Sequence, residues 1–280
     1  MEFVDAAECW HWNEATNEGA FLHTTVIAID QDQKLYFAKV HDRQTNARSE
    51  QIQQWFEIPL EHIYPSLPAD LSVFQGELNA SIYHKKPRFS AYDCSPHLAE
   101  SLLREATIYE RLQQNKSPSI ARCHGCIVSS GRIVGIALSM YDQTLDERMR
   151  QGFEHTQAVR WLDQIRQGLE VLHSKGLAHN DLNPWNVMVS NEDAVIIDFD
   201  SCCPLGEALL KCGTPDWADD SAMISATAND EYSLQKIAAV LGIPDKKFSQ
   251  VPRPRPDYSL SGEAHSCSSI ESLDYHSPQF

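Results

Sequence analysis

The sequence has few basic side chains for its length. Its 280 residues include 23 lysines and arginines against 39 aspartates and glutamates, which gives a formal net charge of −16 at pH 7. A chain with this balance repels phosphate backbones and anionic lipid headgroups. We therefore expect no general binding to nucleic acid and no binding to a membrane surface.

Long apolar runs are also missing. No segment reaches the ~18 consecutive apolar residues that a transmembrane helix needs. The first residues, Met1 to Glu8, lack the basic start and apolar run of a secretory signal. We expect a monomeric intracellular protein, cytoplasmic or nuclear, whose eight cysteines are reduced thiols.

Close cysteine pairs are scarce. Cys123 and Cys126 have the spacing of one zinc knuckle, but no second close pair follows. Cys202, Cys203 and Cys212 could complete a zinc site only if the fold happened to gather them. A single knuckle is a weak signal, which favours thiols over metal.

What is present is a globular composition, with 42% hydrophobic and 22% charged residues, so a packed core is expected. Residues 1–19 are polar, and we expect them to be irregular. The β-prone runs 24–29 and 35–40 predict a hairpin. Residues 249–280 are rich in proline, serine and charge, which predicts a disordered tail.

Two amphipathic helices are predicted. The first begins at Ser95, an N-cap, with Pro96 at its first position, and ends at Ser117-Pro118. Its apolar face is formed by Leu98, Leu102, Tyr109 and Leu112. Glu105 falls inside this apolar stripe. The second helix runs from about Thr156 to Ser174, and Gly176 stops it. Its predicted inward residues are Val159, Leu162, Ile165, Leu169 and Leu172.

Polar groups with catalytic potential gather in two segments. Residues 179–187 lie between the end of the second helix and a β-prone run, and Asp198-Phe199-Asp200 directly follows another apolar run. Loops held between rigid elements are common places for functional side chains. A single carboxylate at a strand end has the simpler explanation that it caps a turn.

Together the two segments resemble the catalytic loop and the metal loop of protein kinases. The family pattern is His-Arg-Asp-Leu-x-x-x-x-Asn followed by Asp-Phe-Gly. The present sequence reads His179-Asn180-Asp181-Leu182-x-x-x-x-Asn186, then Asp198-Phe199-Asp200. The resemblance implies a bilobal α+β fold that uses ATP and Mg²⁺. Asp181 would accept the proton of the acceptor hydroxyl, and Asn186 and Asp198 would be the metal ligands.

A lysine and a glutamate extend the resemblance upstream. Lys85 ends a short predicted strand, and Glu105 follows 20 positions later, which is the family's order for the phosphate-binding lysine and its helix glutamate. Such a pair would explain a charge in an apolar stripe; the alternative is that Glu105 pairs with a neighbouring arginine in solvent. Strand alternation sends Lys85 and Lys86 to opposite faces, so one of them alone can serve. Lys39 lies in a run that imitates the family's strand motif, but 66 residues separate it from Glu105.

The resemblance also extends downstream. Residues 213–217, Gly-Thr-Pro-Asp-Trp, are similar to the end of a kinase activation segment, which implies that Thr214 hydrogen-bonds near Asp181. Asp230 stands where a helix aspartate braces the catalytic loop of the family. We therefore include Thr214 among the candidate catalytic residues.

The resemblance covers about residues 80–241 and implies an adenine-binding hinge. That hinge would be residues 138–141, with Leu138 and Met140 as cofactor-binding positions. The expected fold has a reduced small lobe, a truncated large lobe and an N-terminal β-containing extension. The expected parts are an extension with a hairpin at 1–64, a kinase-like domain at 65–248 (small lobe 65–140, large lobe 141–248) and the tail.

The sequence departs from the family at several points. No Gly-x-Gly-x-x-Gly precedes Lys85, so the usual phosphate cradle is missing or built differently. Asn180 replaces an arginine that reads a phosphorylated activation loop, and Asp200 replaces a glycine. Asn183, which we count among the catalytic positions, stands where serine/threonine kinases carry a lysine near the transferred phosphoryl group. No Ala-Pro-Glu follows Trp217.

Three functions are compatible with this pattern. Pro184 and Thr214 favour a protein serine/threonine kinase, with ATP and a protein as its partners. The missing glycine loop and Asn183 favour a pseudokinase or scaffold. The segments His-Asn-Asp-Leu and Ile-Asp-Phe-Asp are similar to small-molecule kinases of the aminoglycoside and choline type. Together with Pro87 they also resemble a group of compact fungal kinase-like proteins.

Overall fold

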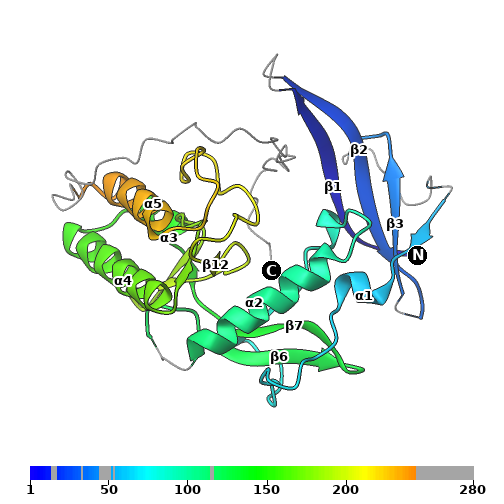
Figure 1. The fold of residues 1–280 in the computed structure, drawn as a ribbon, viewed down its shortest axis with the longest axis horizontal. Helices are drawn as coiled ribbons and strands as arrows, with labels where there is room; N and C mark the ends of the chain where they lie inside the picture. Colours follow the sequence, from blue (N-terminus) through cyan, green and yellow to red (C-terminus); the bar gives the residue numbers. More distant parts are fainter. Residues whose placement is uncertain (14–17, 33, 44–51, 53, 114–116, 244–280) are drawn as a thin grey trace. The chain divides into compact units, whose positions relative to one another are not determined.

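The computed structural model in Figure 1 describes residues 1–13, 18–32, 34–43, 52, 54–113 and 117–243. The chain is a mixed α+β protein that forms two compact units. Unit 1 comprises Met1–Thr107 and His124–Leu138. Unit 2 comprises Ile108–Cys123 and the described chain from Ser139 onward. The predicted fold class and the N-terminal β-sheet are confirmed at this level.

The elements follow the chain in this order. The first part holds β1 (Glu2–Asn13), β2 (Glu18–Ile29), β3 (Leu35–Val40), β4 (Phe56–Glu57), α1 (Leu60–Ile63), β5 (Ile82–Lys85), the 3₁₀ helix η2 (Phe89–Ala91), α2 (His97–Gln113), β6 (Cys123–Ser129) and β7 (Arg132–Ser139). The second part holds β8 (Gln143–Thr144), α3 (Leu145–Arg150), α4 (His155–Ser174), β9 (Leu177–Ala178), β10 (Val187–Ser190), β11 (Asp193–Ile196), β12 (Cys203–Pro204) and α5 (Thr227–Val240).

The N-terminal residues form an antiparallel sheet in the order β1-β2-β3-β4. The predicted hairpin is confirmed, since β2 and β3 pair from Thr24–Val40 to Ile29–Leu35. The prediction that residues 1–19 are irregular was wrong, because β1 pairs with β2 along its length. The register shift between Phe3 and Asp5 leaves an extra residue, Val4, in β1 and so breaks the alternation by which a strand is recognised in sequence, whereas the shift between Cys9 and Trp10 leaves the extra residue in β2.

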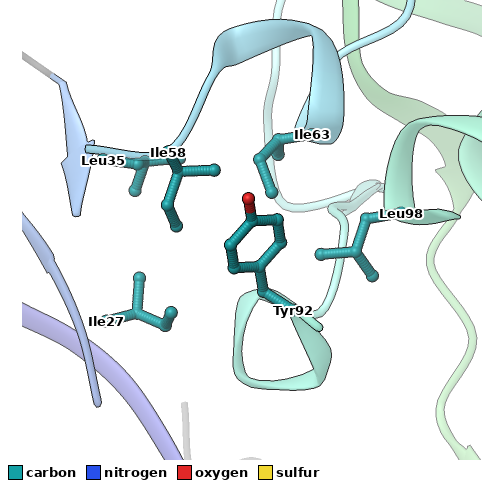
Figure 2. Close-up of a cluster of buried hydrophobic side chains, with 6 residues drawn as sticks. All are labelled: Ile27, Leu35, Ile58, Ile63, Tyr92 and Leu98. Carbon is teal, nitrogen blue, oxygen red and sulfur yellow. The ribbon is translucent and has the colours of Figure 1, made fainter. Parts of the chain in front are cut away.

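A cluster of buried side chains joins this sheet to the segment that precedes and begins α2. Figure 2 shows the Tyr92 ring among the aliphatic side chains of the cluster. Its members are Ile27, Leu35, Ile58, Ile63, Tyr92 and Leu98. The Tyr92 hydroxyl also lies 2.9 Å from Nδ1 of His62, so its polar end is satisfied. The N-terminal sheet therefore shares a hydrophobic core with residues that lie close to the start of α2.

The first predicted helix is confirmed as α2. It begins at His97, whose N–H donates to Oγ of Ser95 over 3.3 Å, and its last described residue is Gln113. The predicted apolar face is buried, with exposures of 6% or less at Leu98, Leu102, Tyr109 and Leu112. Glu105 is 3% exposed and lies in this buried stripe. The helix therefore carries a carboxylate on its inward face.

Unit 2 is built around α4, which packs against β11 and α5 (Figure 1). The predicted helix is confirmed, and Gly176 follows its end with φ +70°, a conformation suited to glycine. Val159 was wrongly placed on the inward face, because its side chain is 47% exposed. Successive helical residues turn by about 100°, and the buried stripe is centred on Trp161 and Ile165, which leaves Val159 beyond its edge.

Three short strands in the order β11-β10-β8 complete this region. Strands β10 and β11 pair antiparallel, with Val187 opposite Ile196 and Ser190 opposite Asp193. The residues that precede β10 and those that follow β11 are the two polar segments found in the sequence. The antiparallel pairing of these strands brings the two segments to the same end of the sheet.

Every helix in the described part of the chain is too short or too polar to cross a bilayer. Among the same residues, no three His, Cys, Asp or Glu side chains form a group that could hold a metal by themselves. Cys123 and Cys126 are buried on β6. The predicted tail, residues 249–280, lies outside the described residues.

Candidate functional site

Lys85 and Glu105 form an ion pair in unit 1. The Lys85 ammonium lies 2.5 Å from Oε1 of Glu105, and the Glu105 side chain is 4% exposed while that of Lys85 is 21% exposed. The structure thus brings together the two residues that the spacing of 20 positions indicated. A carboxylate this deeply buried needs a cation or hydrogen-bond donors to offset its lost hydration.

The strand that carries Lys85 is held close to β7. A Cβ atom on Gly135 would lie 2.3 Å from Nε2 of His84 and 2.6 Å from the carbonyl oxygen of Lys85. The absence of a side chain at Gly135 lets β5 and β7 approach at this point. Burial of the His84 ring, and then the charge of Lys86, lower the pKa of His84. A lowered pKa favours the neutral form of the ring.

Unit 2 holds Asp181 in a hydrogen-bond network. Its Oδ1 atom accepts from the Thr214 N–H over 2.8 Å and from the Thr214 hydroxyl over 2.7 Å. The Asn183 amide nitrogen lies 3.3 Å from the same oxygen and donates to Oγ1 of Thr214 over 3.0 Å. The predicted contact between Thr214 and Asp181 is confirmed. For the second oxygen, Oδ2, the contact found among the described residues is with the Asn186 amide nitrogen at 3.4 Å.

Gly213 allows the chain to approach the loop that carries Asp181. A Cβ atom there would lie 2.5 Å from the Cβ of Ala218 and 3.1 Å from the carbonyl oxygen of Asn180. This close packing places the next residue, Thr214, against Asp181. Steric crowding by these neighbours therefore explains why a glycine, with no side chain, stands first in the Gly-Thr-Pro motif.

Asn183 and Asn186 are buried and shape the loop after Asp181. The Asn183 side-chain oxygen accepts from the N–H groups of Trp185 and Asn186 over 3.0 and 3.1 Å. The Asn186 amide nitrogen donates to the carbonyl oxygen of Asp181 over 2.8 Å. The nitrogen is used in this way, and no described residue bonds to the Asn186 side-chain oxygen, an atom type that can accept a hydrogen bond or bind a cation.

Asp198 follows β11 in a left-handed backbone conformation, with φ +62°. Aspartate is one of the few residues that tolerates this region. The next residue, Phe199, is fully buried, and its ring packs edge-on against Tyr109 with centroids 5.0 Å apart. His179 Nε2 lies 3.0 Å from the carbonyl oxygen of Ile197, and its Nδ1 accepts from the Asp181 N–H over 3.3 Å. These contacts tie the segment at Asp198 to the loop at Asp181.

Asp230 braces the loop from α5, as predicted. It is fully buried and accepts from the backbone N–H groups of His179 and Asn180 over 2.9 and 2.8 Å. His173 Nε2 also lies 2.8 Å from its Oδ2 atom. Asn180 itself has φ +64°, and its side chain bonds to Ser225 and Asn229. Asn180 is buried, and its amide nitrogen also lies 3.4 Å from the Ser201 carbonyl oxygen, so it connects the loop at Asp181 to the segment that follows Asp200.

The residues of this arrangement lie in a region that matches a known family. The sequence profile of the family described as "Protein kinase domain" matches residues 79–233, which is more than half of the 280 residues. The chain belongs to the protein kinase family. The matched region contains both the Lys85–Glu105 pair and the loop network around Asp181.

The similar kinases are distant, and the chain matches only part of each. Mitogen-activated protein kinase kinase 9 of Arabidopsis thaliana is 29% identical over 126 residues, which cover 44% of this chain and 39% of that protein. CBL-interacting protein kinase 8 of Oryza sativa subsp. japonica is 30% identical over 127 residues, 43% of this chain and 28% of that protein. Serine/threonine-protein kinase AfsK of Streptomyces griseus is 38% identical over 90 residues, 28% of this chain and 11% of that protein. The chain thus spans less than half the length of these relatives.

The Asp230 brace predicts a large loss of stability when it is removed from the kinase. In Asp230→Ala, the buried N–H groups of His179 and Asn180 lose their acceptor, at about 1–3 kcal/mol each. We expect the free energy of unfolding in urea to fall by about 3 kcal/mol or more. Asp230→Asn should lose less because it keeps one oxygen acceptor. The exposed Asp220→Ala is the control, and equal unfolding midpoints for Asp230→Ala and Asp220→Ala would contradict the brace.

The predicted hinge of the kinase lies where β7 ends. Leu138 is buried and is the last residue of the segment 124–138 of unit 1, and Met140 is 37% exposed. The Ser139 N–H donates to the Arg122 carbonyl oxygen over 2.9 Å, and the Tyr141 hydroxyl accepts from the Arg122 N–H over 3.0 Å. This segment links the two units covalently, and its role in adenine binding stays a prediction.

The two other lysine candidates differ from Lys85 in their surroundings. Lys39 lies on β3, is exposed and is paired in register with Thr25. Lys86 follows the last residue of β5. The Lys85 ammonium is the one that contacts Glu105 in the structure. The geometry therefore favours Lys85 over Lys39 and Lys86 as the partner of Glu105.

Sequence reasoning missed two features of the kinase loops. Lys211 forms an ion pair with Asp200, at 2.8 Å between Nζ and Oδ1. Trp185 and Trp217 pack edge-on with ring centroids 6.0 Å apart, beside the Asn183 and Thr214 network. Lys211 had a sequence signal, because no other lysine or arginine lies between Lys175 and Lys236.

Proposed function

We propose that the protein is an ATP- and Mg²⁺-dependent phosphotransferase that phosphorylates serine or threonine in proteins. The observation that carries the proposal is the state of the Asp181 carboxylate. Thr214 and Asn183 saturate Oδ1 and fix the orientation of the side chain. Within the part of the chain that the structure describes, Oδ2 has one long contact, to Asn186. It is therefore the atom best placed to accept the proton of an acceptor hydroxyl.

The proposed reaction needs little covalent chemistry from the protein. The acceptor oxygen forms a bond to the γ-phosphorus as the bond from that phosphorus to the β–γ bridging oxygen breaks. The hydroxyl proton goes to Asp181, and ADP leaves. What the residues contribute is orientation and neutralisation of charge.

The residues present fit Mg²⁺ by their donor chemistry. Asn186 and Asp198 offer an amide oxygen and a carboxylate, which are hard ligands of the kind that Mg²⁺ prefers. Two protein ligands suffice, because Mg²⁺ in such sites is completed by phosphate oxygens and water. When bound, the ion would neutralise phosphate charge.

Lys85 would supply a further positive charge to the nucleotide phosphates, and Glu105 would hold it in place. The ion pair between a partly exposed Lys85 and a buried Glu105 supports these roles. We propose backbone groups of residues 138–141, at Leu138 and Met140, as the adenine-binding hinge.

Finer features of the kinase are also proposed. They are a bilobal domain at residues 65–248 divided near residue 140, with a reduced small lobe, a truncated large lobe and residues 1–64 as an extension. The likeness to compact fungal kinases and to choline kinases, the monomeric state and the absence of nucleic-acid or membrane partners stay predictions. The serine/threonine preference is supported by Thr214 and Pro184 and by the distant relative AfsK, a serine/threonine-protein kinase.

One experiment separates this function from its two rivals. Thermal shift with ATP is measured with and without Mg²⁺, and labelled ATP is then incubated with generic proteins, aminoglycosides and choline. We expect a Mg²⁺-dependent shift that Asp198→Asn removes, and phosphate on protein serine or threonine. Phosphate on small molecules alone would select the small-molecule kinase. Absence of any nucleotide-dependent shift would instead indicate a scaffold.

A further inference from the structure

Lys211 is an isolated cation in an acidic stretch. It is the one lysine or arginine between Lys175 and Lys236, and the same stretch contains Asp181, Asp198 and Asp200. Phosphoryl transfer adds the negative charge of the phosphates to these carboxylates. A positive group in this region therefore has a larger electrostatic effect than one on an ordinary surface.

The Lys211 ammonium is held by Asp200. Its Nζ atom lies 2.8 Å from Oδ1 and 2.9 Å from Oδ2 of that residue, so both carboxylate oxygens are engaged. The two side chains are 47% and 32% exposed. Ion pairs with this much exposure contribute at most about 1 kcal/mol to stability. Stabilising the fold is thus a weak explanation for the pair.

The Lys211 ammonium also interacts electrostatically with Asp198 and Asp181, the two carboxylates to which we assign chemical roles. Partial removal from water lowers the pKa of Lys211, but the charges of Asp200, Asp198 and Asp181 outweigh this and leave the pKa above its ordinary value. Lys211 is therefore cationic at neutral pH. Both close contacts go to Asp200, which is outside the proposed metal-ligand pair Asn186 and Asp198.

The catalytic loop itself supplies no cation. Asn183 stands where a lysine would lie, and it is neutral. Its amide hydrogens are used by Asp181 and Thr214, and its oxygen is used by backbone N–H groups. Asn183 therefore has no donor left for a phosphoryl oxygen. Any positive side chain near Asp181 in unit 2 has to come from outside this loop.

We propose that Lys211 is a catalytic residue of the kinase that binds the phosphoryl group being transferred, with Asp200 as the positioning residue that holds it. The inference rests on the proposed function. In the transfer described above, Lys211 stays protonated and takes part in no proton transfer. It stabilises the charge on the equatorial oxygens of the phosphoryl group while the bond to the acceptor forms and the bond to ADP breaks. Asp200, in place of a glycine, and Asn183, in place of a lysine, then compensate each other through Lys211.

The test compares Lys211→Met with Lys211→Arg and Asp200→Asn. Two quantities are measured: the kcat of phosphoryl transfer, and the affinity for Mg²⁺-ADP with and without aluminium fluoride, a mimic of the phosphoryl group in transfer. For Lys211→Met we expect kcat to fall by about 10²-fold. We expect the affinity with aluminium fluoride to fall by about tenfold or more, and the affinity for Mg²⁺-ADP alone to stay nearly unchanged. Lys211→Arg should recover part of both losses, and Asp200→Asn should show a smaller loss of the same kind.

Lys236→Met is the matched control, since this exposed lysine on α5 contacts the ring of Tyr232 and is outside the catalytic machinery. It should behave as the wild type does. The melting temperature of each variant, measured without nucleotide, separates loss of fold from loss of charge. Because Lys211 is exposed, we expect that temperature to be unchanged in Lys211→Met.

The outcomes distinguish the two proposals. If the wild type transfers phosphate and Lys211→Met does so equally well, the role of Lys211 is overturned and the kinase function stands. If Lys211→Met is faster at low Mg²⁺, the lysine is an inhibitory cation that competes with the metal, and the role of Lys211 is again overturned. A wild type that binds no nucleotide overturns the proposed function, and the inference with it.

Discussion

Lys85→Met is expected to lower the rate of phosphoryl transfer by about 10²–10³-fold. The reason is the loss of a fixed positive charge that Glu105 holds at 2.5 Å. Methionine keeps the length and the apolar stem of lysine, so the packing of β5 is disturbed little. The measurement is kcat and KM for ATP with a protein substrate. We expect the larger effect in kcat.

The controls for this prediction are already present in the chain. Lys86→Met and Lys39→Met remove lysines that the sequence left open as alternatives, and both should keep kcat within about threefold of the wild type because neither residue is placed at the phosphates. Lys85→Met also takes a cation away from buried Glu105, which can weaken the fold. Lys85→Arg retains a positive charge for Glu105 and should still lose rate, because the guanidinium differs in shape from an ammonium. Full turnover in Lys85→Met, with loss in either control, would refute the assignment.

Asp181→Asn is expected to lower kcat by about 10³-fold while binding of Mg²⁺-ATP persists. An asparagine oxygen at the position of Oδ1 can keep both hydrogen bonds from Thr214, so the loop should stay ordered. At the position of Oδ2, however, an amide nitrogen cannot accept a proton. The substitution therefore separates the chemical role of Asp181 from its structural one.

The matched control is Asp216→Asn, which changes an exposed aspartate two residues after Thr214. Asp216 has φ +67°, a conformation that asparagine also tolerates, so the control should keep its rate and its melting temperature. Thermal shift with Mg²⁺-ATP shows whether the nucleotide still binds to Asp181→Asn. A variant that binds nucleotide and retains more than about a tenth of the wild-type kcat would show that Asp181 is not the base.

Much of the site could be predicted because its signals are local or follow a fixed spacing. The stripe on α2 and the 20-residue step from Lys85 identified Glu105 as an inward-facing partner, and the structure shows that pair. The contacts of Thr214 with Asp181 and of Asp230 with the loop backbone were expected from the resemblance to kinases and are present. Helical periodicity also located α4, although it assigned Val159 to the buried stripe and the structure shows that side chain exposed.

Other features could not be predicted because they depend on residues that are distant or irregular in sequence. Strand β1 was missed because an extra residue between Phe3 and Asp5 disturbs its alternation, and its pairing with β2 is what defines it. The cluster around Tyr92 draws on residues from Ile27 to Leu98, and no periodic pattern connects them. The partner of Lys211 depends on how the segment after Asp200 turns back, which no local pattern specifies.

By itself, the sequence determined the chemistry available to this kinase: an acidic chain, the residues of a phosphotransferase motif, and the elements that carry them. These follow from composition, from helical and strand periodicity and from motif spacing, which are properties of neighbouring residues. Only the tertiary structure decided which oxygen of Asp181 accepts from Thr214, that the Asn183 amide donates to Asp181 and Thr214, and that Asp200 holds Lys211. Hydrogen bonds and ion pairs depend on distances of a few ångströms between residues far apart in the chain, and packing sets those distances.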